Sequence, residues 1–428
     1  MNRRFAIATV GCKTNQFESA SISRQLLDHG FLQVPFDQPA DIYIVNSCTV
    51  TARADADTRR LVRRCSQRNP SAMVILTGCF AQVARHDAQR LPGVTVVVPN
   101  DEKGIIQKLI EPAQHHAPES STPSGFLPLE IQSDRTRAVI RIQTGCDAFC
   151  SYCIVPYARG KSRSVPLPEI IEGIRTLAPH YQEIVLTGIH IGMYGKDLPG
   201  PVTLCDLLQE IEQTAPSVRI RLGSIEPLEF DERLIRHLAT SKRIAPHLHI
   251  PVQSGSAEIL SAMKRGYGPT EISNLFSRLK NEIPNLTIGI DLIAGFPGET
   301  ENHFHETLRF LENLPFDYAH VFPYSRRKGT AADTMPGHLH PAVIAQRSTI
   351  IREIAEQKRD QWMTRWIGMS DTVLLLDAEN DRSIKGITPS YLPVTLDARS
   401  IESRSEILCR FTSRNGNRLI AEVIETSG

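Results

Sequence analysis

Three cysteines lie close together in the segment GCDAFCSYC, where three residues separate Cys146 from Cys150 and two separate Cys150 from Cys153. Thiolates are soft ligands that select iron–sulfur clusters or zinc over hard cations. Three of them can hold three irons of a four-iron, four-sulfur (4Fe–4S) cluster and leave the fourth iron open to another molecule. A structural zinc site takes four protein ligands, so the local count favours the cluster, with zinc or a disulfide as the alternatives.

A second set of three cysteines is spread over the amino-terminal part of the chain. Cys12, Cys48 and Cys79 each follow a short apolar run and lie in the polar turns VGCKTN, VNSCTVT and LTGCFAQ. If the runs are parallel strands, these cysteines can converge at the carboxyl ends of the strands, where sites form in open parallel sheets. Buried structural cysteines are the alternative, because free cysteine often behaves as a small apolar residue. We expect structural or incidental roles for the other three: Cys65, Cys205 and Cys409.

The strands that this convergence needs are visible as short apolar runs separated by helix-like stretches. Such an alternation predicts βαβ units and a parallel α/β sheet in an amino-terminal domain of residues 1–111. Residues 112–134 are rich in Pro, Ser and His without periodicity, which is typical of a linker or a long loop. The runs are Phe5–Val10, Ile42–Val45, Met73–Leu76 and Val94–Val98.

A central domain of residues 135–366 is predicted from six further strand candidates. Helical patterns lie between them, such as Pro168–Leu177 and Ile272–Leu279, and a helix is expected over Ala342–Trp366. Six βα repeats are too few for an eight-stranded barrel and suit an open, partial parallel barrel, with the cysteine segment after its first strand. The strand candidates are Ala138–Gln143, Glu183–Gly188, Arg219–Ser224, His247–Val252, Thr287–Ile293 and Ala319–Tyr324.

The remaining residues, 367–428, alternate apolar and polar positions in DTVLLLD, LPVTLD, ILCRFTS and LIAEVI, which predicts a small β-barrel. The whole chain has 428 residues, of which 41% are hydrophobic and 22% charged, as expected for a globular protein of two or three domains. The formal net charge of +1 leaves any nucleic-acid binding to local patches.

The composition also indicates the cellular compartment in which the protein is expected. No apolar stretch approaches the length of about 18 residues that a membrane span requires. The amino terminus, MNRRFAIATVGC, is typical of a strand and not of a signal peptide. Nine cysteines without a secretion signal indicate reduced thiols or metal ligands, so we expect a cytoplasmic protein.

The cysteine segment resembles the radical S-adenosylmethionine (SAM) superfamily. The resemblance implies that SAM chelates the open iron of a 4Fe–4S cluster held by Cys146, Cys150 and Cys153. One electron from a reducing donor then splits SAM and releases a 5′-deoxyadenosyl radical. The cofactors carry this chemistry, and the protein orients them.

The order of motifs along the whole chain resembles the methylthiotransferases, which are radical-SAM enzymes that exchange a C–H for a C–S–CH3. This resemblance implies a second 4Fe–4S cluster on Cys12, Cys48 and Cys79, whose open iron holds sulfur, and two SAM molecules, one of which donates methyl. The last module resembles the small β-barrel (TRAM) domain of the family. The motifs are GCKTNQ from Gly11, NSCTV from Asn46, TGCFAQ from Thr77, CSYCIVPYARG from Cys150, LHIPVQSG from Leu248 and DLIAGFPGET from Asp291.

Candidate SAM contacts lie in the loops at the carboxyl ends of the barrel strands. Thr187 ends the second strand, Glu226 follows the third and Gln253 follows the fourth. Glu226 can accept hydrogen bonds from ribose hydroxyls or from the amino group of SAM, and Tyr152 beside Cys153 can lie along the adenine. Ordinary loop capping is the alternative for each of these residues.

Candidate RNA contacts follow the last barrel strand, at the mouth where substrate should enter. Arg326, Arg327 and Lys328 form a basic run there, and such runs can bind phosphates. A solvated charged surface is the alternative interpretation. The partner implied by the resemblance is a tRNA anticodon loop, whose unstacked bases are open to a protein.

Three branches of the family are candidates, two that modify adenosine beside the tRNA anticodon and one that modifies a ribosomal-protein aspartate. The segment LTGIHIGMYGKDL, residues 186–198, resembles the branch that methylthiolates C2 of N6-threonylcarbamoyladenosine at tRNA position 37. The isopentenyladenosine branch is the alternative enzyme, and a non-catalytic iron–sulfur or zinc RNA-binding protein is the alternative of another class. We expect a monomer that depends on a reducing electron donor.

Overall fold

The computed structural model describes residues 3–110, 136–380, 383–397 and 406–424. They form two compact units. Unit 1 gathers the amino-terminal residues together with 140–165 and 325–334, and unit 2 gathers 166–324 and the residues from 335 onward, with a short segment that ends at residue 139. The predicted linker 112–134 lies outside the described residues, and the predicted domain limits stay a prediction.

Unit 1 is built on a five-stranded sheet of order β2-β1-β3-β4-β5, in which every pair is parallel. The predicted parallel α/β sheet is therefore confirmed. Sequence patterns missed β2, because a strand of two residues carries no periodicity. The strands are β1 (Arg4–Thr9), β2 (Leu32–Gln33), β3 (Ile42–Ser47), β4 (Met73–Gly78) and β5 (Val96–Val98).

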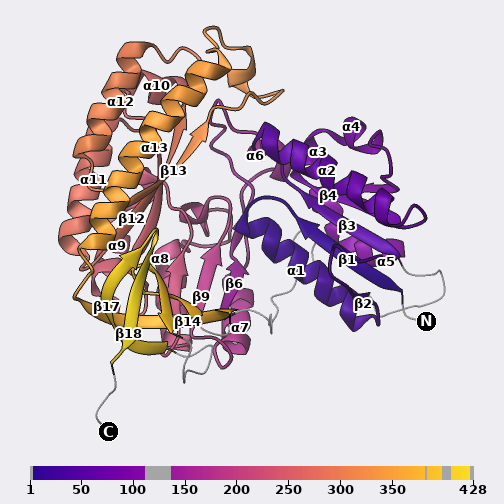
Figure 1. Ribbon diagram of the computed structural model, residues 1–428, viewed down its shortest axis with the longest axis horizontal. Coiled ribbons are helices and arrows are strands. Elements are labelled where there is room, and N and C mark those ends of the chain that lie inside the picture. Colours follow the sequence, from indigo (N-terminus) through magenta and orange to yellow (C-terminus); the bar gives the residue numbers. More distant parts are fainter. Residues whose placement is uncertain (1–2, 111–135, 381–382, 398–405, 425–428) are drawn as a thin grey trace. The chain divides into compact units, whose positions relative to one another are not determined.

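Helices cover both faces of this sheet, as Figure 1 shows. Apolar side chains of α1 and α5 pack on one face, and those of α2, α3 and α4 pack on the other. Both faces are buried, so the central strands β3 and β4 carry continuous apolar runs, Ile42–Val45 and Met73–Leu76, and do not alternate. The elements are α1 (Lys13–Asp28), α2 (Ala52–Arg68), α3 (Cys79–Val83), α4 (Arg85–Gln89), the 3-10 helix η1 (Asn100–Ile105) and α5 (Ile106–Ile110).

The strands of the partial barrel form two three-stranded sheets, of order β10-β9-β6 and β11-β12-β13. The pairs β9–β10, β11–β12 and β12–β13 are parallel. Isolated bridges join Ile220 to Ile244 and Ser224 to His249, and thereby link the two sheets. All six predicted strands are present: β6 (Arg137–Arg141), β9 (Glu183–Thr187), β10 (Arg219–Leu222), β11 (His247–Gln253), β12 (Thr287–Ala294) and β13 (Tyr318–Pro323).

Helices lie between consecutive strands, and polar side chains cap several of their amino termini. Thr203 caps α8 in a reciprocal pair with Asp206, Asp231 caps α9 and Thr300 caps α12. The cysteine segment is followed by a short helix, α6 (Val155–Arg159), between the strands β7 (Gln143–Thr144) and β8 (Arg163–Ser164). The helices of unit 2 are α7 (Leu167–Leu177), α8 (Leu204–Thr214), α9 (Glu232–Thr240), α10 (Ala257–Ala262), α11 (Pro269–Glu282), α12 (Glu301–Asn313) and α13 (Pro341–Thr364).

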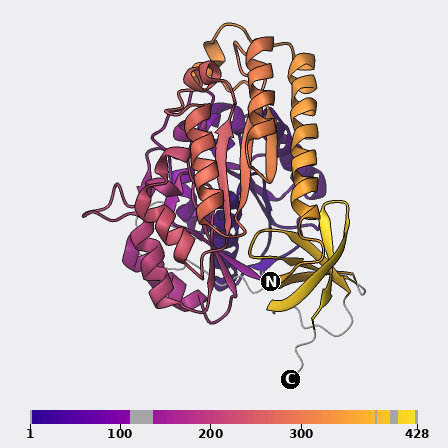
Figure 2. The same cartoon turned by 90° about the vertical axis from the view of Figure 1, so that its left-hand side faces the viewer.

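The carboxyl-terminal strands form a closed barrel of order β14-β15-β16-β18-β17, which confirms the predicted small β-barrel. Figure 2 shows it at one end of α13. Trp362, Met363 and Trp366, at and just beyond the end of α13, belong to the same apolar core as the barrel strands. The strands are β14 (Ser370–Asn380), β15 (Ser383–Ile387), β16 (Pro393–Asp397), β17 (Glu406–Asn415) and β18 (Arg418–Val423).

The loop between β15 and β16 of the closed barrel contacts strands β9 and β10 of the partial barrel at a buried ion pair. Arg221 of β10 is fully buried and lies 2.7 Å from Glu183 of β9. It also donates to the carbonyls of Pro389 and Thr388, and its guanidinium lies over the ring of Tyr391 at 5.1 Å. The charged Arg221 side chain therefore has partners from the strands and from the loop.

Within the described residues, every helix is too short or too polar to cross a membrane.

Replacing Arg221 with methionine should lower the stability of the protein markedly. The substitution leaves Glu183 buried with only the more distant Arg137 and Arg219 as cationic partners. Breaking a buried pair in this way costs about 3 kcal/mol or more. Denaturant unfolding followed by circular dichroism measures the loss.

The matched control is Arg233→Ala, which removes an ion pair with Asp206 that is open to solvent. Exposed pairs contribute little, so this variant should unfold close to the wild-type midpoint. Equal midpoints for Arg221→Met and Arg233→Ala would contradict the stabilising role of the buried pair.

Candidate functional site

The three amino-terminal cysteines lie at the carboxyl ends of neighbouring strands in unit 1. Cys12 is the N-cap of α1 just after β1, Cys48 directly follows β3, and Cys79 is the first residue of α3 after β4. Because β1, β3 and β4 are adjacent in the sheet, these ends lie side by side. Cys12 is exposed, whereas Cys48 and Cys79 are buried.

The close approach of two of these loops requires glycine at position 11. Its φ of +106° is a left-handed conformation, and a Cβ built there would lie 2.7 Å from the Cβ of Cys48 and 2.9 Å from its Sγ. A side chain at this position would push the loops apart. Gly11 therefore keeps the chain just before Cys12 against Cys48.

The three thiols also interact electrostatically. Burial, together with the neighbouring thiols of Cys79 and Cys12, raises the pKa of the Cys48 thiol to about 11. Soft sulfur donors at three neighbouring strand ends are the donor type that suits a cluster or a thiophilic metal, which would bind them as thiolates.

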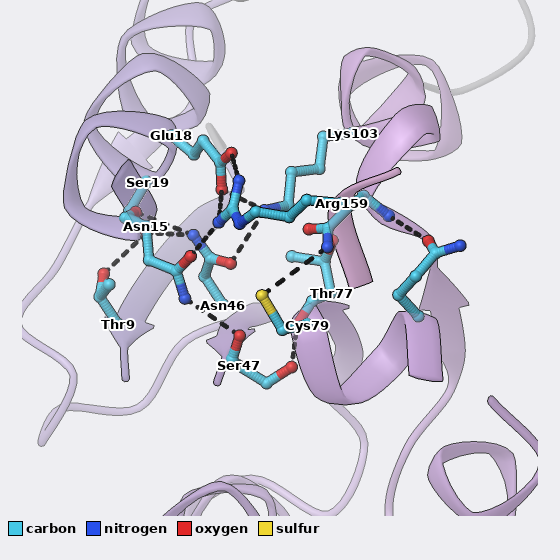
Figure 3. A network of polar contacts seen from close by, with 12 residues as sticks. Thr9, Asn15, Glu18, Ser19, Asn46, Ser47, Thr77, Cys79, Lys103 and Arg159 are labelled. Carbon is cyan, nitrogen blue, oxygen red and sulfur yellow. Dashed lines mark hydrogen bonds and ion pairs between the residues drawn. The ribbon is translucent and has the colours of Figure 1, made fainter. Parts of the chain in front are cut away.

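Asparagine side chains hold these loops in place, as Figure 3 shows. Asn15 of α1 donates to the carbonyl of Val10 at 2.8 Å and to that of Ser47 at 3.0 Å. Asn100 lies 3.9 Å from the Cys79 sulfur and donates to the carbonyl of Ala158 at 2.7 Å. The amino-terminal cysteine site is thereby tied to the segment that follows the second cysteine set.

The second cysteine set lies in the loop between β7 and α6, and all three thiols are half-buried. Backbone hydrogen bonds fix both ends of the loop, since Cys146 donates to Gly160 at 3.1 Å and Ala332 donates to Ser151 at 2.7 Å. Gly145 has a φ of +74°, and a Cβ there would lie 1.9 Å from the carbonyl oxygen of Lys161. The backbone therefore folds the loop tightly while the sulfur atoms stay accessible.

Two short helices connect the cysteine sets. Cys79 opens α3, α6 begins two residues after Cys153, and α3 packs against α6. Both sets belong to unit 1, although the second is 67 residues beyond Cys79 in the sequence, counted from 79 to 146. The structure thus brings two groups of three thiols onto neighbouring elements of one compact unit.

A buried carboxylate joins the same elements. Glu18 of α1 pairs with Arg159 of α6 at 2.8 Å, with Arg141 of β6 at 3.0 Å and with Lys103 of η1. All four side chains are nearly inaccessible to solvent. In Figure 3, Glu18 and Arg159 face each other beside Asn15 and Asn46. A pocket of about 350 Å³ adjoins the network, lined in part by Arg141, Arg159 and Asn100.

The charges of this network favour anions nearby. Burial alone would raise the pKa of Glu18, but the charges of Arg159, Lys103 and Arg141 outweigh burial and hold that pKa well below its usual value. One carboxylate against three basic side chains leaves positive charge in excess, and Arg159 interacts with both Cys79 and Cys12. A nearby cation favours the thiolate form that metal binding requires.

Three of the four predicted SAM contacts lie in unit 2, at the ends of neighbouring barrel strands. Thr187 is the buried last residue of β9, and Glu226 lies just beyond β10 and pairs with Arg265. Gln253 ends β11 at a register shift, with a φ of +73°. Tyr152 is half-buried and belongs to unit 1. The SAM-binding assignment of all four stays a prediction.

The predicted RNA contacts lie in unit 1 and differ in how far their side chains are exposed to solvent. The Arg326 side chain is 61% exposed and pairs with Asp333 at 2.6 Å, and Lys328 is exposed. Arg327 is only 12% exposed, pairs with Asp55 of α2 at 2.7 Å and donates to the carbonyl of Thr49. Arg327 therefore has buried partners close to Cys48, whereas Arg326 and Lys328 are exposed to solvent.

Sequence reasoning missed the Glu18 network. In the sequence, Arg159 stands out only as part of the motif CSYCIVPYARG. The available signal was α1 itself, in which polar residues at helical spacing, Thr14, Asn15, Glu18 and Ser19, are buried where apolar residues are usual. A polar face that is buried must find charged or hydrogen-bonding partners.

Replacing Glu18 with glutamine should destabilise the protein at neutral pH and make it less sensitive to acid. Folding lowers the pKa of Glu18, so its contribution is complete above the usual carboxyl value of 4.5 and is lost as the pH falls below that value. The difference in unfolding free energy between wild type and Glu18→Gln should therefore shrink between pH 7 and about pH 3.5.

Denaturant unfolding of iron-free protein at both pH values measures this difference without a contribution from cluster loss. Glu172→Gln, which removes an exposed carboxylate paired with Arg175, is the control and should behave as wild type. A stability gap for Glu18→Gln that stays constant with pH would contradict the ionised state of Glu18.

Two family models match the chain. One, described as "Uncharacterized protein family UPF0004", covers residues 4–99, and the other, "Radical SAM superfamily", covers residues 140–311. The first spans the sheet of unit 1 with Cys12, Cys48 and Cys79, and the second spans the other cysteine set and most of the partial barrel.

Among solved structures, the chain is similar to the radical S-adenosylmethionine methyltransferase TsrM from Kitasatospora setae. The TM-score is 0.55 at 14% identity, over 78% of this chain and 74% of that one. The cobalamin-dependent radical enzyme OxsB matches with a TM-score of 0.52 at 12% identity, over 83% and 56% of the two chains. At these identities the likeness supports the radical-SAM fold alone.

Curated relatives are more similar in sequence. The threonylcarbamoyladenosine tRNA methylthiotransferase MtaB of Bacillus subtilis is 35% identical over 91% of this chain and 89% of its own, and that of Aquifex aeolicus is 34% identical over 91% and 96%. The tRNA-2-methylthio-N(6)-dimethylallyladenosine synthase of Carboxydothermus hydrogenoformans is 33% identical over 83% of each. With this similarity along nearly its whole length, and with two cysteine sets on one compact unit, the chain belongs to the radical-SAM methylthiotransferase family.

Proposed function

We propose that the protein methylthiolates C2 of N6-threonylcarbamoyladenosine at position 37 of tRNA. The observation that carries the proposal is the pair of three-cysteine sets in one compact unit, where α3, which begins at Cys79, packs against α6, which follows the second set. The reaction needs a radical and a sulfur donor at one carbon, and holding both there is a proximity effect. The relatives named for threonylcarbamoyladenosine, at 33 to 35% identity, support the choice of substrate.

The donor sets suit two 4Fe–4S clusters, one held by Cys12, Cys48 and Cys79 and the other by the cysteines of the 146–153 loop. When bound, the clusters and SAM supply the radical and the sulfur that replaces hydrogen on the base. With three protein thiolates per cluster, each cluster would have one iron left for a further ligand, SAM at one cluster and sulfur at the other. The protein's task is to hold these open positions in a fixed relation, and Glu18 with Arg159 braces the elements that carry them.

The remaining assignments follow from the same proposal. Thr187, Glu226, Gln253 and Tyr152 contact SAM, and Arg326 and Lys328 contact phosphates of the anticodon stem-loop. Arg327, which is paired with Asp55, positions this basic segment beside the loop of Cys48. The protein works as a cytoplasmic monomer and receives electrons from a reducing partner.

Methylthiolation of isopentenyladenosine is the second candidate. A relative named for dimethylallyladenosine is 33% identical to this chain, close to the values of the first group. Overall identity therefore separates the two substrates weakly, and the product has to be identified directly.

Removing either cysteine set should abolish methylthio transfer, but the two variants should differ in whether they still cleave SAM. Without Cys146, Cys150 and Cys153 the protein should lose about four of the eight irons of two clusters and should no longer form 5′-deoxyadenosine. Without Cys12, Cys48 and Cys79 it should also lose about four irons but still cleave SAM, since the radical-forming cluster is intact. Iron analysis and chromatography of the reaction products after anaerobic reconstitution measure both outcomes.

The control removes the three other cysteines together, as Cys65→Ala, Cys205→Ala and Cys409→Ala, and should keep the full iron content. If the variant lacking Cys12, Cys48 and Cys79 had the same iron content as wild type, these residues would be structural cysteines and not cluster ligands. Failure of the wild-type protein to cleave SAM would favour a non-catalytic RNA-binding protein.

The wild-type enzyme should convert tRNA that carries threonylcarbamoyladenosine and leave tRNA that carries isopentenyladenosine unmodified. Both substrates offer the same C2 atom, so only recognition of the N6 substituent separates them. Mass spectrometry of nucleosides after digestion identifies the product. The reverse preference would overturn the substrate assignment and leave the two-cluster assignment intact.

A further inference from the structure

Helix α2 carries a concentration of positive charge that neither the cysteine sets nor the proposed SAM contacts use. Its 17 residues include six arginines and two aspartates, whereas the whole chain has a formal net charge of +1. One side of the helix is buried and packs on the sheet of unit 1, on the same face as α3 and α4 (Figure 1). The buried residues are Ala54, Thr58, Val62 and Cys65. The arginines therefore lie on the remaining surface of the helix.

Four of the arginines lie opposite the buried side. Successive helical residues are about 100° apart around the axis, so positions 53, 60, 63 and 64 fall within roughly 100° of one another. All four residues are exposed to solvent. At about 1.5 Å per residue they extend over about 16 Å along the axis. These residues, Arg53, Arg60, Arg63 and Arg64, form the α2 basic face.

Most of the charge on this face is uncompensated. The two aspartates of α2 are already paired, one with Arg60 at 2.7 Å and the other with Arg327. Arg53, Arg63 and Arg64 have no ion-pair partner among the residues that the structure describes. Arginines three and four residues apart on a helix repel one another, and a cation in the first turn, such as Arg53, opposes the helix dipole. The helix carries these unfavourable interactions on its surface, and an anionic ligand would relieve them.

The basic run that follows β13 is attached to the first turn of the same helix. The Ser325 hydroxyl accepts a hydrogen bond from the backbone N–H of Ala52 at 3.0 Å, and Arg327 pairs with Asp55 at 2.7 Å. The two exposed cations of the run flank Arg327 in the sequence and therefore lie close to this turn. The run and the α2 basic face together form one positively charged surface of unit 1.

This surface begins beside the amino-terminal cysteine site. Helix α2 starts at Ala52, shortly after Cys48, and its N-cap Thr51 accepts a hydrogen bond from the N–H of Ala54. Under the proposed function the target base has to reach the sulfur held at this site. The RNA strand that carries the base then passes the first turn of α2, and the phosphates that follow along the strand can meet the cations that recur along the helix.

A phosphate backbone fits this surface better than an acidic protein does. Guanidinium groups bind phosphate oxygens through pairs of parallel hydrogen bonds. A nucleic-acid strand repeats its negative charge at short, regular intervals and matches a row of cations. The other exposed residues of α2 offer no large apolar or aromatic side chain of the kind that forms the centre of a protein–protein interface. They are Ala52, Ala56 and Gln67.

We propose that the α2 basic face binds phosphates of the tRNA strand that carries the target base. The inference rests on the proposed function in that the substrate is tRNA, and it adds the surface that holds the strand beyond the base itself. Binding of this kind is independent of base sequence and releases counterions from the RNA, so its strength depends on salt concentration.

The test measures the affinity of reconstituted protein for tRNA at several salt concentrations by fluorescence anisotropy. The triple variant Arg53→Gln, Arg63→Gln and Arg64→Gln should bind about tenfold more weakly at about 0.15 M salt, and the slope of log affinity against log salt should become shallower by about 2. Glutamine is as good a helix former as arginine, so the fold is kept. Lysine at the same three positions keeps the charge and should retain the wild-type slope.

The matched control is the triple variant Arg236→Gln, Arg243→Gln and Arg309→Gln, which removes the same amount of charge from unit 2. These arginines are exposed and have no ion pair within the described part of the chain. Charges that do not contact the RNA are largely screened at this salt concentration, so the control should bind within about twofold of wild type. Both triple variants should keep the wild-type iron content and cleave SAM without tRNA.

Wild-type affinity and salt slope in the α2 variant would overturn this inference. An equal loss of affinity in both triple variants would also overturn it, because binding would then depend on net charge alone. A loss of SAM cleavage with a protein reductant but not with dithionite, at unchanged tRNA affinity, would assign the face to the electron donor instead. Conversion of isopentenyl tRNA by wild type would overturn the proposed substrate and leave the role of α2 standing.

Discussion

The buried carboxylate of Glu18 is the constraint on which unit 1 depends. Withdrawing a carboxylate from water costs several kcal/mol unless cations and hydrogen bonds replace the water. Its partners come from three places in the chain, Lys103, Arg141 and Arg159, so none of these segments can be displaced without exposing or isolating a charge. The positive charge that remains in excess acts on Cys79 and Cys12 through Arg159. The contacts that hold the unit together are thus the ones that prepare its sulfur atoms for binding.

The two cysteine sets reach their positions by different means. The first uses the regular geometry of a parallel sheet, in which three adjacent strands end at one edge and Gly11 lets two loops touch. The second uses an irregular loop fixed by backbone hydrogen bonds and by Gly145. The sheet gives a rigid base, whereas the loop keeps its thiols half-exposed, as a site that must admit a second molecule requires.

Much of this arrangement was predictable from local pattern. Apolar runs marked the strands of unit 1 except β2 and the six strands of the partial barrel, and a cysteine after each of three runs predicted their convergence, because parallel strands end at a common edge. The Glu18 network was not predictable to the same degree. The polar residues at helical spacing in α1 indicate a buried polar face, but the partners of Glu18 lie far apart in the sequence and meet it only after folding. The ion pair of Arg327 was hidden for the same reason, since Asp55 lies 272 residues away.

The loop that joins β15 to β16 has a consequence for how the chain is made. It supplies the carbonyls of Thr388 and Pro389 to Arg221, and Tyr391 stacks on His247 with ring centroids 4.2 Å apart. Arg221 leaves the ribosome 167 residues before Thr388 does. Because domains tend to fold in the order of synthesis, the strands around Arg221 emerge with a charge whose last partners do not yet exist. Only a polypeptide that extends through this loop can complete that contact, so translation that stops before residue 388 yields a partial barrel in which Arg221 lacks these partners.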